Sequence, residues 1–116
     1  MFEIEIPFEK GGVSYINSDN MAIEPDVIIC AKPGQTRHTK LPFKCYYIHL
    51  IATDTMLYDK LMSLPNFIKT DKYQKYYEIF EKLCTNYDTA IGFDEIILQS
   101  LILELIYTLM CDSKKN

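Results

Sequence analysis

The hydrophobic pattern of this chain changes its period near residue 53, and that change restricts the fold more than any other feature. In residues 1–52, apolar residues alternate with polar ones or form short runs between Gly-Gly and Pro-Gly turns, as in the opening stretch FEIEIPF. This pattern is typical of β-strands. In residues 54–112, apolar residues recur every three or four positions, as in amphipathic helices. Strands followed by helices predict an α+β fold rather than a parallel α/β sheet.

The spacing of the elements gives a more detailed expectation. Six short strands with turn signals between them predict a β-sandwich or a small barrel. In the helical half, Pro65 ends the first helix, and Asp71 with Gln74 three residues later has the capping-box spacing at the start of the second. The expected helices cover approximately residues 56–61, 71–87 and 93–110.

Length, charge and cysteine pattern exclude several classes of protein. A chain of 116 residues has the size of one domain. Its net charge of −4 and its scattered basic residues argue against nucleic-acid binding by this chain. No C-x-x-C pair and no signal-peptide pattern are present, so reduced thiols in a cytoplasmic protein are expected. The longest apolar runs are shorter than a membrane span, and no membrane association is expected.

Residues 23–50, IEPDVIICAKPGQTRHTKLPFKCYYIHL, contain a characteristic order of motifs. Pro25-Asp26 precedes three hydrophobic residues, Pro33-Gly34 precedes His38, and an aromatic segment ends in Ile48-His49-Leu50. In this order the segment resembles the N-terminal sensor domain of AraC-type transcriptional regulators. Arg37 stands where many members of that family have the histidine.

The resemblance covers nearly the whole chain and has several implications. It implies a single regulatory domain over residues 1–116, with a cupin-like β-barrel (jelly roll) over about 1–52 and two or three helices over about 54–112. Such domains bind a small-molecule effector and dimerise through their last helices. The family's DNA-binding helix-turn-helix domain should follow and is absent from this sequence, so the chain is expected to be a regulatory domain alone or a natural short homologue.

The candidate ligand-binding residues are His38, Thr39, Cys45, Tyr47 and His49. Strand alternation places Cys45, Tyr47 and His49 on one face, which we expect to be the inner face of the barrel. By resemblance, Cys45 and Tyr47 fall where sugar-sensing relatives contact their ligand, and Thr39 falls near a third such position. The alternative is that these side chains only fill the interior of a small barrel.

Catalytic and metal-binding roles have little support in the sequence. Two histidines without a His-x-His pair are too few for a usual catalytic metal site, so neither a metal nor another cofactor is expected. Cys45 lies among aromatic residues, which should raise the pKa of its thiol rather than activate it. The acidic pairs Glu3/Glu5, expected to point outward from a strand, and Asp94/Glu95, expected at a helix start, are interpreted as structural.

The last helix is apolar around roughly two-thirds of its circumference, which is more than one packing partner covers. We therefore expect a homodimer through this helix, with a seam that includes some of Leu98, Ile102, Leu105 and Leu109. The alternative is that the preceding helix and the barrel cover both of its sides.

These expectations favour a non-enzymatic effector-binding and dimerisation domain of a bacterial transcriptional regulator, which contacts DNA only through a separate C-terminal domain. One alternative is a small stand-alone cupin enzyme, such as an isomerase or a metal-dependent oxygenase. Another is an interaction domain that forms heterodimers with full-length relatives. The identity of the effector does not follow from the sequence.

Overall fold

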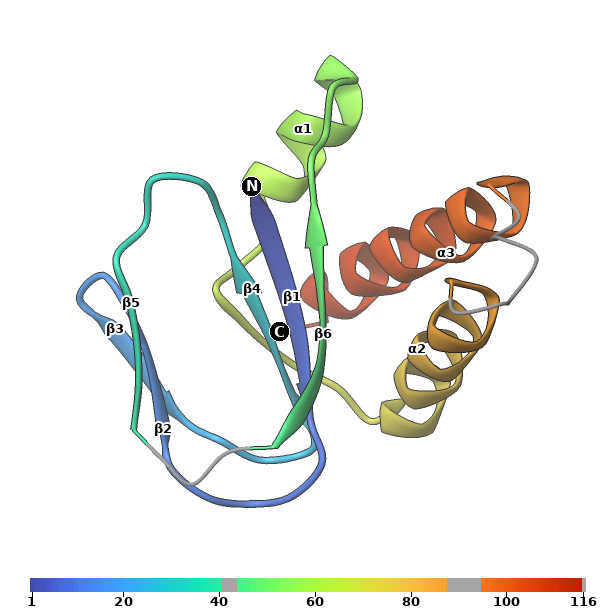
Figure 1. Ribbon diagram of the computed structural model, residues 1–116. Helices are drawn as coiled ribbons and strands as arrows, with labels where there is room; N and C mark the ends of the chain where they lie inside the picture. Colours follow the sequence, from blue (N-terminus) through green and yellow to red (C-terminus); the bar gives the residue numbers. More distant parts are fainter. Residues whose placement is uncertain (41–43, 88–94, 116) are drawn as a thin grey trace.

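Two antiparallel sheets and three helices make up the computed structural model, which describes residues 1–40, 44–87 and 95–115 (Figure 1). One sheet has four strands in the order β6-β1-β4-β7, and the other has three in the order β3-β2-β5. The strands are β1 (Phe2–Pro7), β2 (Val13–Ile16), β3 (Asp19–Ala22), β4 (Val27–Ala31), β5 (Arg37–Lys40), β6 (Cys45–Leu50) and β7 (Phe67–Lys69).

The α+β class predicted from the sequence is confirmed, but the sheets do not form a closed barrel. Within the described residues no strand belongs to both sheets, and each sheet keeps two edge strands. The strand β7 was not expected, because it is only three residues long and lies between two helices. It pairs with β4 and so extends the larger sheet on the side opposite β6.

The three helices are α1 (Thr55–Met62), α2 (Tyr73–Tyr87) and α3 (Glu95–Ser113). Asp54 caps α1, since its carboxylate accepts a hydrogen bond from the backbone N–H of Leu57 at 3.0 Å. Before α2, the hydroxyl of Thr70 accepts from the backbone N–H of Lys72 at 2.9 Å, although the sequence had indicated Asp71 as the cap. The expected start of the last helix at Phe93 lies outside the described residues.

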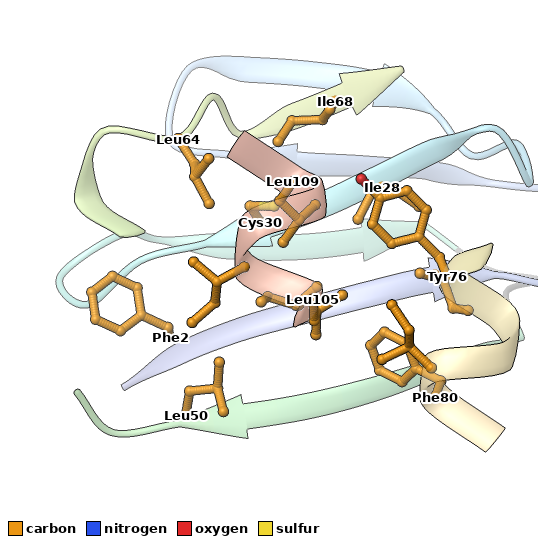
Figure 2. Close-up of a cluster of buried hydrophobic side chains, with 14 of the residues drawn as sticks. Phe2, Ile28, Cys30, Leu50, Leu64, Ile68, Tyr76, Phe80, Leu105 and Leu109 are labelled. Carbon is orange, nitrogen blue, oxygen red and sulfur yellow. The ribbon is translucent and has the colours of Figure 1, made fainter. Parts of the chain in front are cut away.

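The larger sheet is the middle of three layers, with α2 and α3 on one face and the smaller sheet on the other (Figure 1). The main core fills the space between this sheet and the helices. Figure 2 shows how Leu105 and Leu109 of α3 point onto the sheet beside Ile28 and Cys30 of β4. All four are at most 3% exposed. The burial of these apolar side chains away from water is the dominant stabilising term of such a layer.

A smaller cluster lies between the two sheets and consists of Ile16, Ile23, Ile29 and Ala31. Both faces of the central strands are therefore covered. The radius of gyration of the chain is 14.0 Å. That value is close to the roughly 13 Å expected for a compact domain of this length.

Of the described helices, α3 alone is long and apolar enough to cross a membrane, judged by length and composition. A core helix of a soluble protein passes the same test. Within the described chain 39% of the apolar stretch of α3 is buried, including Leu105 and Leu109, which are 0% exposed.

A buried polar network holds the end of α3 against the start of α2. The side chain of Asp112 is 2% exposed and accepts hydrogen bonds from the hydroxyls of Thr70 and Tyr76, each at 2.7 Å. Because a buried carboxylate without partners is costly, this network determines how the two helices meet.

Replacing Tyr76 by Phe should lower the free energy of unfolding by about 1–3 kcal/mol, because one of the hydrogen bonds to the buried Asp112 carboxylate is lost. Urea denaturation followed by circular dichroism measures this change. Tyr58→Phe is the matched control, since Tyr58 is 40% exposed and keeps its ring contact with Phe2. Equal stability of Tyr76→Phe and the wild-type chain would contradict the role given to this network.

Candidate ligand-binding site between the sheets

The guanidinium of Arg37 joins the two sheets. Arg37 begins β5 in the smaller sheet and forms ion pairs with Glu3 and Glu5 of β1 in the larger one. Its Nη2 lies 2.6 Å from Oε1 of Glu5, and its Nη1 contacts Oε1 of Glu3. Arg37 is the cross-strand partner of Ile16, whose side chain is buried between the sheets. Since paired residues point to the same face, Arg37 is directed inward.

The expectation that Glu3 and Glu5 point outward is therefore wrong. Alternation along β1 directs Phe2, Ile4 and Ile6 toward the helices and both glutamates toward the smaller sheet. The strand is flanked by β4 and β6, and both of its faces are covered. In such a strand an acidic residue between apolar ones can be enclosed.

Burial controls the charge of this cluster. Glu5 is 8% exposed, and burial raises its pKa to about 7, against a smaller opposing effect of a hydrogen bond from the Cys45 thiol at 3.9 Å. The guanidinium of Arg37 also favours the charged carboxylate. The charged and the neutral form of Glu5 are therefore both accessible near neutral pH.

The thiol of Cys45 is not activated for nucleophilic attack. Burial and the neighbouring Glu5 raise its pKa to about 12, so it stays protonated at neutral pH. The direction expected from the sequence is confirmed, but the surroundings differ, because the face of β6 that carries Cys45 is turned toward the carboxylate of Glu5.

Two further predicted residues, Tyr47 and His49, follow Cys45 along the same face of β6. The Nε2 atom of His49 contacts the carboxylate of Glu3, and the ring of Tyr47 lies 5.4 Å from the imidazole, measured between centroids. Tyr47 is 63% exposed and lies at the border of the cluster. His49, Glu3 and Arg37 thus form a continuous polar chain from the edge of the larger sheet to the smaller one.

The smaller sheet contributes Ser14 and Thr39, which are cross-strand partners on the inward face. Ser14 is 0% exposed. In the described part of the chain, its hydroxyl oxygen and the Nε atom of Arg37 are buried without a hydrogen-bond partner. Buried polar groups of folded proteins nearly always have partners, either in the protein or in bound water or ligand. In folded proteins, bound water or a ligand commonly supplies the missing partner of such atoms.

The structure brings Thr39, Cys45, Tyr47 and His49 to the face between the sheets, but not His38. The imidazole of His38 lies on the opposite face of β5, 5.7 Å from the ring of Tyr15 between centroids. Neighbouring residues of a strand point to opposite sides, so inward Arg37 and Thr39 require an outward His38.

Sequence reasoning missed Glu3, Glu5, Ser14 and Arg37. One signal was available in the sequence. Arg37 stands at the position where the resemblance to AraC-type sensor domains leads one to expect a histidine. Among the residues with described placement, no group of three His, Cys, Asp or Glu side chains could hold a metal ion.

The placement of α3 removes Leu105 and Leu109 from the predicted dimer seam, while Leu98 and Ile102 stay a prediction. Leu105 and Leu109 are 0% exposed within the chain itself, so they cannot meet a second copy. Leu98 and Ile102 are partly buried against the same core. A helix that is apolar nearly all round does not reveal from its sequence which side faces the core.

No protein-family model, no curated protein and no solved structure matches this chain.

Stability should decrease as the pH rises through the range in which Glu5 loses its proton. The pKa of Glu5 is raised from 4.5 to about 7 on folding, so the folded chain binds the proton more tightly than the unfolded one. The resulting stabilisation is complete below pH 4.5 and is lost as the pH rises through about 7, by up to roughly 3 kcal/mol.

Glu5→Gln should remove this decrease, because the amide stays neutral at every pH. Denaturation at several pH values between 4.5 and 8 measures the effect, and Glu9→Gln at an exposed position is the control. If Glu5→Gln and the wild-type chain show the same pH dependence, the assignment to Glu5 is wrong.

Proposed function

We propose that this chain is the effector-binding and dimerisation domain of a bacterial transcriptional regulator, with the effector bound between the two sheets. The supporting observation is the pair of buried polar atoms without partners, Ser14 Oγ and Arg37 Nε, at a polar cluster in the part of the chain that is described. Each polar group buried in this layer adds a desolvation cost that an apolar residue would avoid. Ligand sites typically combine apolar walls with a few polar groups that fix the ligand's orientation.

The proposal includes the family suggested by the motif order. In it, the two sheets are an open form of the cupin-like jelly roll, and the domain works in the cytoplasm as part of an AraC-type regulator. DNA contact would come from a separate helix-turn-helix domain, since this chain has a net charge of −4. The effector would alter regulation by changing the contacts between Arg37 and the glutamates of β1.

The second candidate function is a small cupin enzyme, and one observation favours it. A carboxyl group with a pKa of about 7, as in Glu5, has the value expected of a general acid or base at neutral pH. Within the described residues its neighbours are the protonated Cys45 thiol and the Arg37 guanidinium, which can also be explained as structural partners. The regulator is therefore the preferred proposal.

Binding between the sheets can be tested with a panel of neutral sugars, sugar acids and small amines in a thermal-shift assay, followed by calorimetric titration of any compound that stabilises the chain. We expect a compound that binds one to one. Thr39→Val should weaken it at least fivefold, which corresponds to about 1 kcal/mol for a lost hydrogen bond. His38→Ala, on the outward face of the same strand, is the matched control and should leave the affinity unchanged. A panel without any binder, or equal losses in both variants, would argue against the site.

Dimerisation is proposed to use the exposed side of α3. Ile96, Leu103 and Tyr107 are 80%, 49% and 66% exposed, and their spacing of seven and four residues places them along one side of the helix. Exposed apolar side chains in a row along one side of a helix are typical of an interface.

Leu103→Lys should convert a dimer into a monomer in sedimentation equilibrium at tens of micromolar and keep the circular-dichroism spectrum of the folded chain, because Leu103 lies outside the core. Gln74→Lys adds the same side chain at an exposed position of α2 and should remain dimeric. A wild-type chain that sediments as a monomer would refute this part of the proposal.

A further inference from the structure

We infer that a groove between β6 and the two C-terminal helices is a second binding site, suited to a small, neutral molecule with a mainly apolar body. The groove has a volume of about 520 Å³. Small-molecule sites typically have volumes of roughly 300–1,000 Å³. The inference does not rest on the proposed function, because the groove follows the outer edge of the larger sheet, although the two sites share Tyr47 and His49 of β6.

The walls of the groove come from three elements that are distant in sequence. Residues 47–50 of β6 form one wall, and Leu83, Cys84 and Tyr87 of α2 form the second. Leu98 and Ile102 of α3 form the third wall of the groove. Because the site needs a strand edge and two helices at once, it exists only in the folded chain and is largely pre-formed.

The groove is open because aromatic packing covers only part of β6. At the Cys45 end of the strand, the ring of Tyr46 stacks on Phe80 and contacts Tyr77, with centroids 6.1 Å and 5.6 Å apart. Farther along β6, Leu98 and Ile102 are only partly buried where they approach the strand. Apolar walls that lack contacts on one side gain dispersion energy when an apolar molecule fills the space.

The chemistry of the lining selects the class of ligand. None of the described residues that line the groove is Asp, Glu, Lys or Arg. A charged ligand would lose hydration there without meeting an opposite charge, so a neutral ligand is favoured. The thiol of Cys84 can hydrogen-bond to a polar substituent of the ligand. A compound with an aromatic or alkyl body and one hydroxyl or amide group fits this arrangement.

An extended peptide fits the groove less well. Although the outer edge of β6 has no strand partner in the described residues, only four of its positions line the groove. An added strand usually pairs over five or six residues. A second copy of the chain is also disfavoured, because the exposed residues Leu103 and Tyr107 are not among those that line the groove.

The neutral fluorescent probe N-phenyl-1-naphthylamine tests this site directly. We expect saturable one-to-one binding with a blue-shifted emission. Cys84→Arg should weaken the binding at least tenfold, because a long cationic side chain then occupies the groove. Thr85→Arg adds the same side chain at the adjacent exposed position of α2, outside the lining residues, and should bind the probe normally. Circular dichroism establishes that both variants are folded.

Two further measurements separate the possible occupants. Saturating probe should slow the alkylation of Cys84 by a maleimide, which peptide mass mapping follows at that residue. In the second measurement, Leu103→Lys should bind the probe with the same affinity as the wild-type chain. Probe binding that is equal in Cys84→Arg and Thr85→Arg would overturn the inference. It would also be overturned if Cys84→Arg dissociated a dimer, since the groove would then hold a second copy, or if Leu103→Lys abolished probe binding.

Discussion

The ion pairs of Arg37 with Glu3 and Glu5 are the interaction on which the relation between the two sheets depends. The sheets share no strand in the described part of the chain, and the apolar cluster between them is small. Arg37 therefore supplies a large part of the specific contact across this space. Without the guanidinium, two carboxylates would face each other in a partly buried region, and removing one member of such a group is usually strongly destabilising. The same residues hold the layers together and form the candidate site.

The alternation of β1 explains how one strand serves two different layers. Phe2, Ile4 and Ile6 belong to the core beneath α2 and α3, whereas Glu3 and Glu5 meet Arg37 on the other side. A change in register by one residue would place the carboxylates in the apolar core and the isoleucines against the guanidinium. The sequence of this strand thus specifies its register strongly, and with it the position of the polar cluster relative to β6.

Part of this arrangement could be predicted from the sequence because it depends on local periodicity. The change from a period of two to a period of 3.6 gave the α+β class and the three helices, and alternation placed Cys45, Tyr47 and His49 on one face. Other features depend on tertiary contacts. Whether Glu3 faces water is determined by the smaller sheet, which covers that face of β1. Leu105 could not be told from Leu103 on a helix that is apolar around most of its circumference. The separation of the strands into two sheets is set by pairing between distant segments, which no short motif encodes.

His49 gives the polar cluster and the groove a physical connection. Its Nε2 contacts Glu3, which is paired with Arg37, and the same residue lines the groove at the edge of β6. A molecule in the groove that moves the imidazole would change the contacts of Glu3, and a molecule between the sheets that competes for Arg37 would change the contacts of His49. Coupling between two binding sites must be reciprocal in free energy. If the two ligands favour the same position of Glu3, each raises the affinity for the other by the same factor, and if they favour different positions, each lowers it by the same factor.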